Sequence, residues 1–161
     1  DQTIVLEKYD TLIKALKALP TDREGYGLVH EDMHHSNFFV DSGRITVFDF
    51  DDCQYHWFAS DIGIPLFYVM QSKRLNETTP DFARRFFGCF MEGYARKNSI
   101  AKEWLERIPL FHKLRELMLY IILYDEEAFD LNEWCSDFFR GRQERIEREK
   151  LPISRPMRLM L

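Results

Sequence analysis

The sequence predicts an α+β fold that is mainly helical, on three observations. Five or six stretches carry apolar residues at helical spacing. One short pair of β-branched and aromatic runs is joined by a turn, which predicts a single hairpin. The 161 residues are 45% hydrophobic, enough for one substantial core and too few for two ordinary domains. We therefore expect residues 1–161 to form a single domain.

The predicted helices follow one another along most of the chain. The first ends before Pro20, which stops it. A later helix can be capped by Ser60 or by Asp61, because both side chains accept backbone hydrogen bonds at helix starts. The predicted helices are 3–19, a segment from 60 or 61 to about 70, 79–94, a segment from 101 that is interrupted at Pro109, and 131–150; the stretch 53–57 is expected to be irregular.

The hairpin is predicted from the runs 38–40 and 45–48, with the turn-forming residues 41–44 between them. A hairpin brings its two ends together. Asn37 precedes the first strand and Asp49 follows the second, so their side chains are expected to be neighbours. An amide oxygen and a carboxylate in that position could hold one magnesium ion.

The segment around this hairpin has the pattern of a phosphoryl-transfer site. His30, Asp32 and Asn37 occur in the order H-x-D-x-x-x-x-N, and Asp49 with Phe50 follows after the second strand. Such a site needs a carboxylate that orients and deprotonates a hydroxyl, together with hard oxygen ligands for magnesium. Asp32 lies where it could face a hydroxyl, whereas His30 is better placed to brace the loop.

This segment resembles the catalytic core of the aminoglycoside phosphotransferase family, relatives of the protein kinases that phosphorylate hydroxyls of small molecules. The family pattern is H-G-D-x-H-x-x-N, a hairpin, I-D-F/W-D-D and then D-L/I-A/G. The chain has H-E-D-M-H-H-S-N at 30–37, F-D-F-D-D at 48–52 and D-I-G at 61–63, which with the hairpin is about a fifth of its length. It departs from the pattern at Glu31, where the family usually has glycine, and at 35–36, where Pro-Gly is common.

The resemblance implies the C-terminal lobe of a protein-kinase-like fold with a small catalytic hairpin. It also implies ATP-dependent transfer of the γ-phosphoryl group to a hydroxyl of an aminoglycoside-like, homoserine-like or choline-like substrate, with Mg²⁺ as cofactor. The implied site residues are the catalytic base Asp32, the magnesium ligands Asn37 and Asp49, and the loop support Asp61. His30 and His34 are also expected to support the loop, and Asp51 either contacts a second metal or the substrate or is a solvated loop acid.

A competing interpretation is a zinc site. His30, His34 and His35 cluster in the sequence, and carboxylates stand nearby. The hard oxygens of Asn37 and Asp49 are better suited to magnesium than to zinc, so the magnesium interpretation is favoured.

The residues before the motif lack two parts of a complete kinase. Residues 1–27 contain no glycine-rich loop and no strand lysine of the V-A-I-K type. We expect the N-terminal nucleotide lobe to be absent from this chain, which leaves two hypotheses. The chain is the catalytic lobe of a small-molecule kinase, weakly active or inactive as an isolated fragment, or it is a catalytically silent binding or scaffold module. The intact Asp32, Asn37 and Asp49 favour the first.

The net charge of the chain indicates which kinds of binding partner to expect. The formal net charge is −5 with a pI of about 5.6, so the chain lacks the basic surface that nucleic-acid binding requires. We expect a small-molecule hydroxyl substrate and a nucleoside triphosphate as partners, and no nucleic acid. Glu126, Glu127 and Asp130 either line a pocket for a cationic substrate or lie on a solvated surface.

Cysteine spacing and hydropathy bear on localisation. Cys53, Cys89 and Cys135 are odd in number and form no C-x-x-C pair, which is typical of reduced thiols. No apolar run approaches the roughly 20 residues of a membrane span, and no signal segment opens the chain. The sequence therefore predicts a cytoplasmic protein without membrane association.

Overall fold

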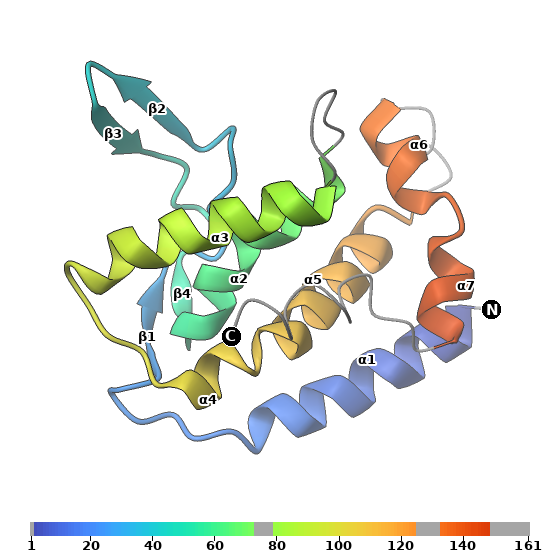
Figure 1. Ribbon diagram of the computed structural model, residues 1–161. Helices are drawn as coiled ribbons and strands as arrows, with labels where there is room; N and C mark the ends of the chain where they lie inside the picture. Colours follow the sequence, from blue (N-terminus) through green and yellow to red (C-terminus); the bar gives the residue numbers. More distant parts are fainter. Residues whose placement is uncertain (1, 73–78, 125–132, 149–161) are drawn as a thin grey trace. The chain divides into compact units, whose positions relative to one another are not determined.

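The computed structural model describes residues 2–72, 79–124 and 133–148, and its helices and strands confirm the mainly helical α+β class. The described chain separates into two compact units. One comprises the residues up to Leu19 together with those from Pro109 onward, and the other comprises Pro20–Ile108. Each unit is described by itself, and the expectation of a single domain stays a prediction. The elements are α1 (Gln2–Lys17), β1 (Tyr26–Val29), β2 (Phe38–Asp41), β3 (Arg44–Val47), β4 (Gln54–Trp57), α2 (Phe58–Gln71), α3 (Thr79–Ala95), α4 (Lys102–Leu105), α5 (Ile108–Ile122), α6 (Glu133–Phe139) and α7 (Arg142–Glu147) (Figure 1).

The first unit is built from α1, α5, α6 and α7. Helix α1 packs against α7, and α7 packs against α6. The ammonium group of Lys8 donates to the backbone oxygens of Ile146 and Glu147, both at 2.7 Å, and so satisfies carbonyls at the end of α7. Its buried apolar side chains are Val5, Leu12, Leu16, Phe111, Leu114, Leu117, Tyr120, Cys135, Phe138, Phe139 and Ile146.

Two helix boundaries in this part of the chain differ from the prediction. The last predicted helix is divided at Gly141, whose φ of +63° is left-handed and ends the helical path between α6 and α7. Residues 131 and 132 lie outside the described residues. Pro109 lies in the first turn of α5, where proline fits, and the break between α4 and α5 falls at residues 106–107 instead.

The second unit contains two antiparallel two-stranded sheets, β1 with β4 and β2 with β3. The predicted hairpin is confirmed as β2–β3. Its turn residues Ser42 and Gly43 have φ values of +48° and +78°, the sign required by a tight two-residue hairpin turn. Strand β4 replaces the stretch that was predicted to be irregular. That prediction was wrong because β4 is formed by pairing with β1, where Tyr26 lies opposite Trp57, and a local pattern does not reveal so distant a partner.

Helix α2 follows β4 without a loop and packs against α3 (Figure 1). Trp57 holds the N-cap position, so the prediction that Ser60 or Asp61 caps this helix was wrong. Both residues lie inside the first turns, and their side chains reach the loop after β1 instead. In the described ranges, no helix has both the length and the apolar character needed to cross a membrane.

Candidate active site

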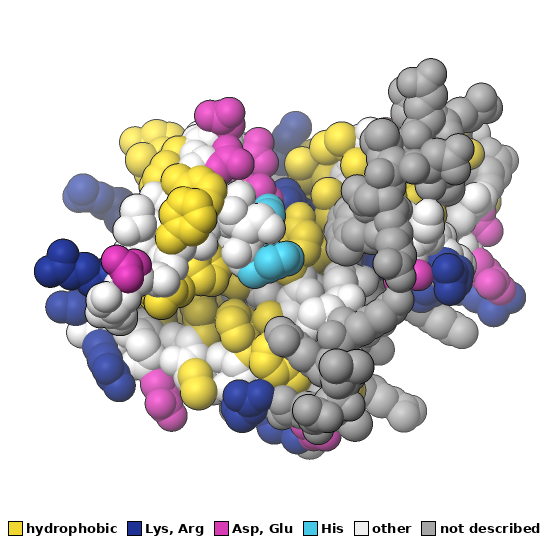
Figure 2. Space-filling model, turned by 90° about the horizontal axis from the view of Figure 1, so that it is seen from above, with side chains coloured by type: hydrophobic (Ala, Val, Ile, Leu, Met, Phe, Trp, Pro, Cys, Tyr) yellow, Lys and Arg dark blue, Asp and Glu magenta, His cyan; other side chains and the backbone are white. Residues whose placement is uncertain are grey.

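The candidate site is the loop of residues 30–37 between β1 and β2, together with the residues that follow β3. Both segments belong to the second unit, so the site's geometry is defined within that unit. Figure 2 shows acidic side chains grouped beside histidine side chains on one face, with hydrophobic side chains next to them. Asp49 and Asp51 are exposed, and Asn37 is buried.

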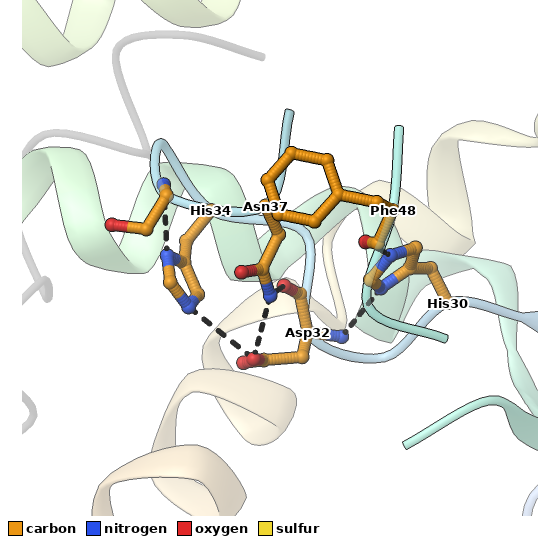
Figure 3. Close-up of polar contacts among 6 residues, drawn as sticks. His30, Asp32, His34, Asn37 and Phe48 are labelled. Atoms are coloured by element: carbon orange, nitrogen blue, oxygen red, sulfur yellow. Dashed lines mark hydrogen bonds and ion pairs between the residues drawn. The ribbon is translucent and has the colours of Figure 1, made fainter. Parts of the chain in front are cut away.

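Asn37 holds Asp32 in place. Its amide nitrogen donates to the backbone oxygen of Asp32 at 2.9 Å and to the carboxylate oxygen Oδ2 of Asp32 at 3.0 Å (Figure 3). Only 4% of Asn37 is exposed, so these bonds fix the rotation of a confined side chain. Because the nitrogen is committed to Asp32, the amide oxygen is the atom that can bind a cation.

His30 ties the loop to the end of the hairpin. Its Nδ1 accepts the backbone N–H of Asp32 at 3.3 Å, and its Nε2 lies 3.0 Å from the backbone oxygen of Phe48. An Nδ1 that accepts carries no proton in the neutral ring, so Nε2 carries it and donates to Phe48. With both nitrogens engaged, the geometry supports a bracing role for His30 rather than proton transfer or metal binding.

His34, like Asn37, contacts the carboxylate of Asp32. Its Nε2 lies 3.3 Å from Oδ2 of Asp32, and its Nδ1 accepts the backbone N–H of Ser36 at 3.2 Å (Figure 3). The ring also packs on Tyr68 of α2, with centroids 4.8 Å apart. Asn37 and His34 therefore both direct a nitrogen at Oδ2 of Asp32, which restrains the carboxylate while leaving its side chain 18% exposed.

The hairpin brings Asn37 to the position where Asp49 leaves the sheet. The backbone N–H of Phe48 donates to the backbone oxygen of Asn37 at 3.1 Å, and Asp49 is the next residue. Asp49 has a left-handed φ of +63°, a conformation that aspartate adopts more readily than most residues. An amide oxygen and an exposed carboxylate at this place are hard ligands that fit magnesium.

The zinc interpretation is not supported by the geometry. Among the described residues no group of three histidine, cysteine, aspartate or glutamate side chains is placed to hold a metal ion. The ring centroids of His34 and His35 are 5.7 Å apart, and His30 is committed to the backbone. The acidic residues Glu126, Glu127 and Asp130 lie outside the described residues.

Asp61 contacts the loop through Glu31. Its Oδ1 accepts the backbone N–H of Glu31 at 2.8 Å. Burial raises the pKa of Asp61 above its ordinary value, a shift that the hydrogen bond from Glu31 opposes and the nearby Glu31 charge reinforces. This position is compatible with the predicted role of Asp61 in supporting the loop.

Sequence reasoning missed a second group of contacts beside the loop. The side chain of Glu31 is buried, accepts a hydrogen bond from the hydroxyl of Ser60 at 2.7 Å, and lies 3.3 Å from Nδ1 of His56. Glu31 was noted only as a departure from glycine, and that departure was the available signal. His56 and Ser60 carried none, because their contact with Glu31 depends on β4 and α2 lying behind the loop.

The candidate site lies in a part of the chain that is similar to known proteins. A sequence profile described as the phosphotransferase enzyme family matches residues 2–97, which include every residue of the candidate site. Amicoumacin kinase from Bacillus subtilis (strain 168) is 41% identical over 133 residues, covering 82% of this chain and 39% of that protein. The solved structure of amicoumacin kinase hAmiN in complex with AMP-PNP, Ca²⁺ and Ami matches with a TM-score of 0.86 and 34% identity, covering 100% of this chain and 49% of that one.

These matches agree with the site built from the residues. The structural match confirms the predicted kinase-like fold, and the chain spans less than half the length of each relative. The matching profile extends over more than half of the chain and through its loop, hairpin and first helix after the hairpin. The chain belongs to the phosphotransferase enzyme family.

Proposed function

We propose that this chain supplies the catalytic base and the metal ligands for ATP-dependent transfer of a γ-phosphoryl group to a hydroxyl of a small molecule. The observation that carries the proposal is the restrained carboxylate of Asp32, which Asn37 contacts at 3.0 Å and His34 at 3.3 Å. A base must be oriented before it can accept a proton from the attacking hydroxyl, and these contacts provide that orientation.

In the proposed reaction, the carboxylate of Asp32 accepts the hydroxyl proton as the hydroxyl oxygen forms a bond to the γ-phosphorus. The bond between the γ-phosphorus and the β–γ bridging oxygen of ATP breaks, and ADP leaves. Asn37 keeps Asp32 in position through its amide nitrogen and offers its amide oxygen, with the carboxylate of Asp49, to a magnesium ion. Bound magnesium would neutralise charge on the triphosphate and hold it in register. Asp51, exposed two residues after Asp49, would contact a second metal or the substrate.

The names of the relatives support this reaction and indicate which substrate and which nucleotide to test first. One is named as a kinase of amicoumacin, and the structural relative is a complex with a nucleotide analogue, a divalent cation and Ami. We infer that amicoumacin is the first substrate to test, with aminoglycosides, homoserine and choline as the other classes. Because the chain spans 39% and 49% of these relatives, we propose that it acts together with an N-terminal nucleotide lobe.

The test is a phosphotransfer assay on the chain alone and on the polypeptide extended by a nucleotide lobe. The extended wild type is expected to form a phosphorylated product, and Asp32→Asn to lower that rate by about 10²- to 10⁴-fold without lowering the thermal unfolding temperature. Asp41→Asn, the same change at an exposed hairpin aspartate, is the matched control and should retain full activity. If the extended wild type and Asp32→Asn are equally inactive across the substrate panel, the chain is a binding or scaffold module.

A further inference from the structure

Glu31 has a backbone conformation that its residue type does not favour. Its φ is +61°, in the left-handed region where side chains with a Cβ are unfavourable and glycine is tolerated. Nevertheless, only 9% of the residue is exposed. A buried carboxylate in a left-handed turn carries two unfavourable features at once, so contacts of the residue must hold it there.

The contacts of Glu31 come from strand β4 and helix α2. The hydroxyl of Ser60 in α2 donates to Oε1 of Glu31 at 2.7 Å. Nδ1 of His56 in β4 lies 3.3 Å from the same oxygen. The carboxylate of Asp61, also in α2, accepts the backbone N–H of Glu31 at 2.8 Å. Side chain and backbone of Glu31 are therefore both attached to α2.

The turn at Glu31 determines where Asp32 points. The peptide group that joins the two residues ends in the N–H of Asp32, which donates to Nδ1 of His30. A rotation at Glu31 would break this bond and displace the Asp32 carboxylate from Asn37 and His34. Displacements of about 1 Å at a reacting group can lower a rate by about 10²-fold.

We propose that Glu31 is a positioning residue for the phosphotransfer reaction, whose buried side chain holds the left-handed turn that directs Asp32. The inference rests on the proposed function for its kinetic consequence. Its structural part is independent of that function: the side chain, and not only the freedom of the backbone, maintains the turn. Glutamine at this position can still accept the Ser60 hydrogen bond, whereas glycine permits the backbone conformation but makes no side-chain contact.

The first test measures hydrogen exchange of the amides of residues 31 and 32, relative to the amide of Phe67, which lies in the buried part of α2. In Glu31→Gly, protection of these two amides is expected to fall about tenfold or more relative to Phe67. In Glu31→Gln, protection should stay within about twofold of the wild type. Ser42→Gly is the matched control, because it changes another left-handed residue that is exposed and should leave the loop amides unchanged.

The second test measures phosphotransfer kinetics of the same variants in the polypeptide extended by the nucleotide lobe. Glu31→Gly should lower kcat about 10- to 100-fold with KM for both substrates nearly unchanged, and Glu31→Gln should restore most of kcat. Ser60→Ala should lower kcat less than Glu31→Gly does. Adding Ser60→Ala to Glu31→Gly should lower kcat little further, because both substitutions remove the same hydrogen bond between Ser60 and Glu31.

The outcomes separate this inference from the proposed function. Wild-type kcat and loop protection in Glu31→Gly would overturn the inference, since backbone freedom would then suffice, and so would a Glu31→Gln variant as impaired as Glu31→Gly. If no extended form shows phosphotransfer, the proposed function fails, and amide protection alone decides whether the Glu31 side chain maintains the turn.

Discussion

Each compact unit contains a buried glutamate, and the two are held in different ways. In the first unit, which is called the helical unit below, Glu116 forms an ion pair with Arg142 at 2.5 Å, and their side chains are 3% and 2% exposed. The Arg142 guanidinium also donates to the backbone oxygen of Phe138 and lies over its ring, 4.1 Å from the centroid. Glu31 in the second unit, which contains the candidate site, contacts the hydroxyl of Ser60 and the ring of His56 instead.

Glu116 therefore contributes to the packing of two helices, whereas Glu31 orients the loop that contains Asp32. Burial raises the pKa of Glu116 and lowers that of Arg142, because losing water penalises both charges more than their mutual attraction compensates. Such a pair fixes how α5 and α7 meet but adds little net stability. Glu31 lies one residue from Asp32, so we expect changes there to alter the site's geometry more than the free energy of unfolding.

The largest predicted effect is a loss of stability when one partner of the Glu116–Arg142 ion pair is removed. Arg142→Met leaves the buried charge of Glu116 uncompensated and should lower the free energy of unfolding by about 3–5 kcal/mol, measured by chemical denaturation. The double variant Glu116→Leu/Arg142→Met removes both charges and should recover most of this loss. A loss below about 1 kcal/mol in the single variant would contradict the structural role assigned to the pair.

A smaller effect, on activity rather than stability, is expected at Asn37. Asn37→Ala removes both the restraint on Asp32 and the amide oxygen offered to magnesium. In the extended polypeptide it should lower kcat/KM about 10- to 100-fold and raise the Mg²⁺ concentration needed for half-maximal rate. An unchanged Mg²⁺ dependence would exclude Asn37 as a metal ligand, whatever happens to kcat.

The next prediction concerns pH and Asp61. Because burial raises its folded-state pKa above 3.8, the protonated form is favoured on folding. The stabilising contribution is fully present below pH 3.8 and is lost as pH rises through the folded-state pKa. Asp61→Asn should remove this decline, which a series of denaturation curves across that window would measure. An unchanged pH profile would show that the pKa of Asp61 does not differ between the folded and unfolded states.

The smallest effect is expected at an exposed ion pair of the helical unit. Glu144 and Arg148 are each 61% exposed and lie four residues apart along α7 and its C-terminus. Arg148→Gln should lower the free energy of unfolding by about 0.3–0.5 kcal/mol, and 1 M salt should abolish the difference. A larger or salt-independent loss would mean that Arg148 has a role that its exposure does not indicate.

The hairpin and the order of the site residues could be predicted from the sequence because both depend on short-range patterns. The turn at Ser42 and Gly43 and the alternating strands on either side determine β2–β3 locally. In this hairpin the backbone N–H of Phe48 donates to the backbone oxygen of Asn37, which places Asn37 beside the residue before Asp49. That the side chains of Asn37 and Asp49 are neighbours stays a prediction. The bonds of Asn37 and His34 to Asp32 were not predicted, since rotamers depend on packing.

Only the tertiary structure decided what lies behind the loop. Strand β4 exists because it pairs with β1, and α2 begins directly from it, which brings His56, Ser60 and Asp61 to Glu31. The sequence shows Glu31 only as a departure from glycine and predicts a helix cap at Ser60 or Asp61, with loop support by Asp61 implied by the resemblance. The sequence by itself determined which groups the candidate site contains, because local chemistry specifies the turn and the strands of the hairpin. The contacts that hold Glu31 were decided by the tertiary structure, because they join residues about thirty positions apart, which no local pattern encodes.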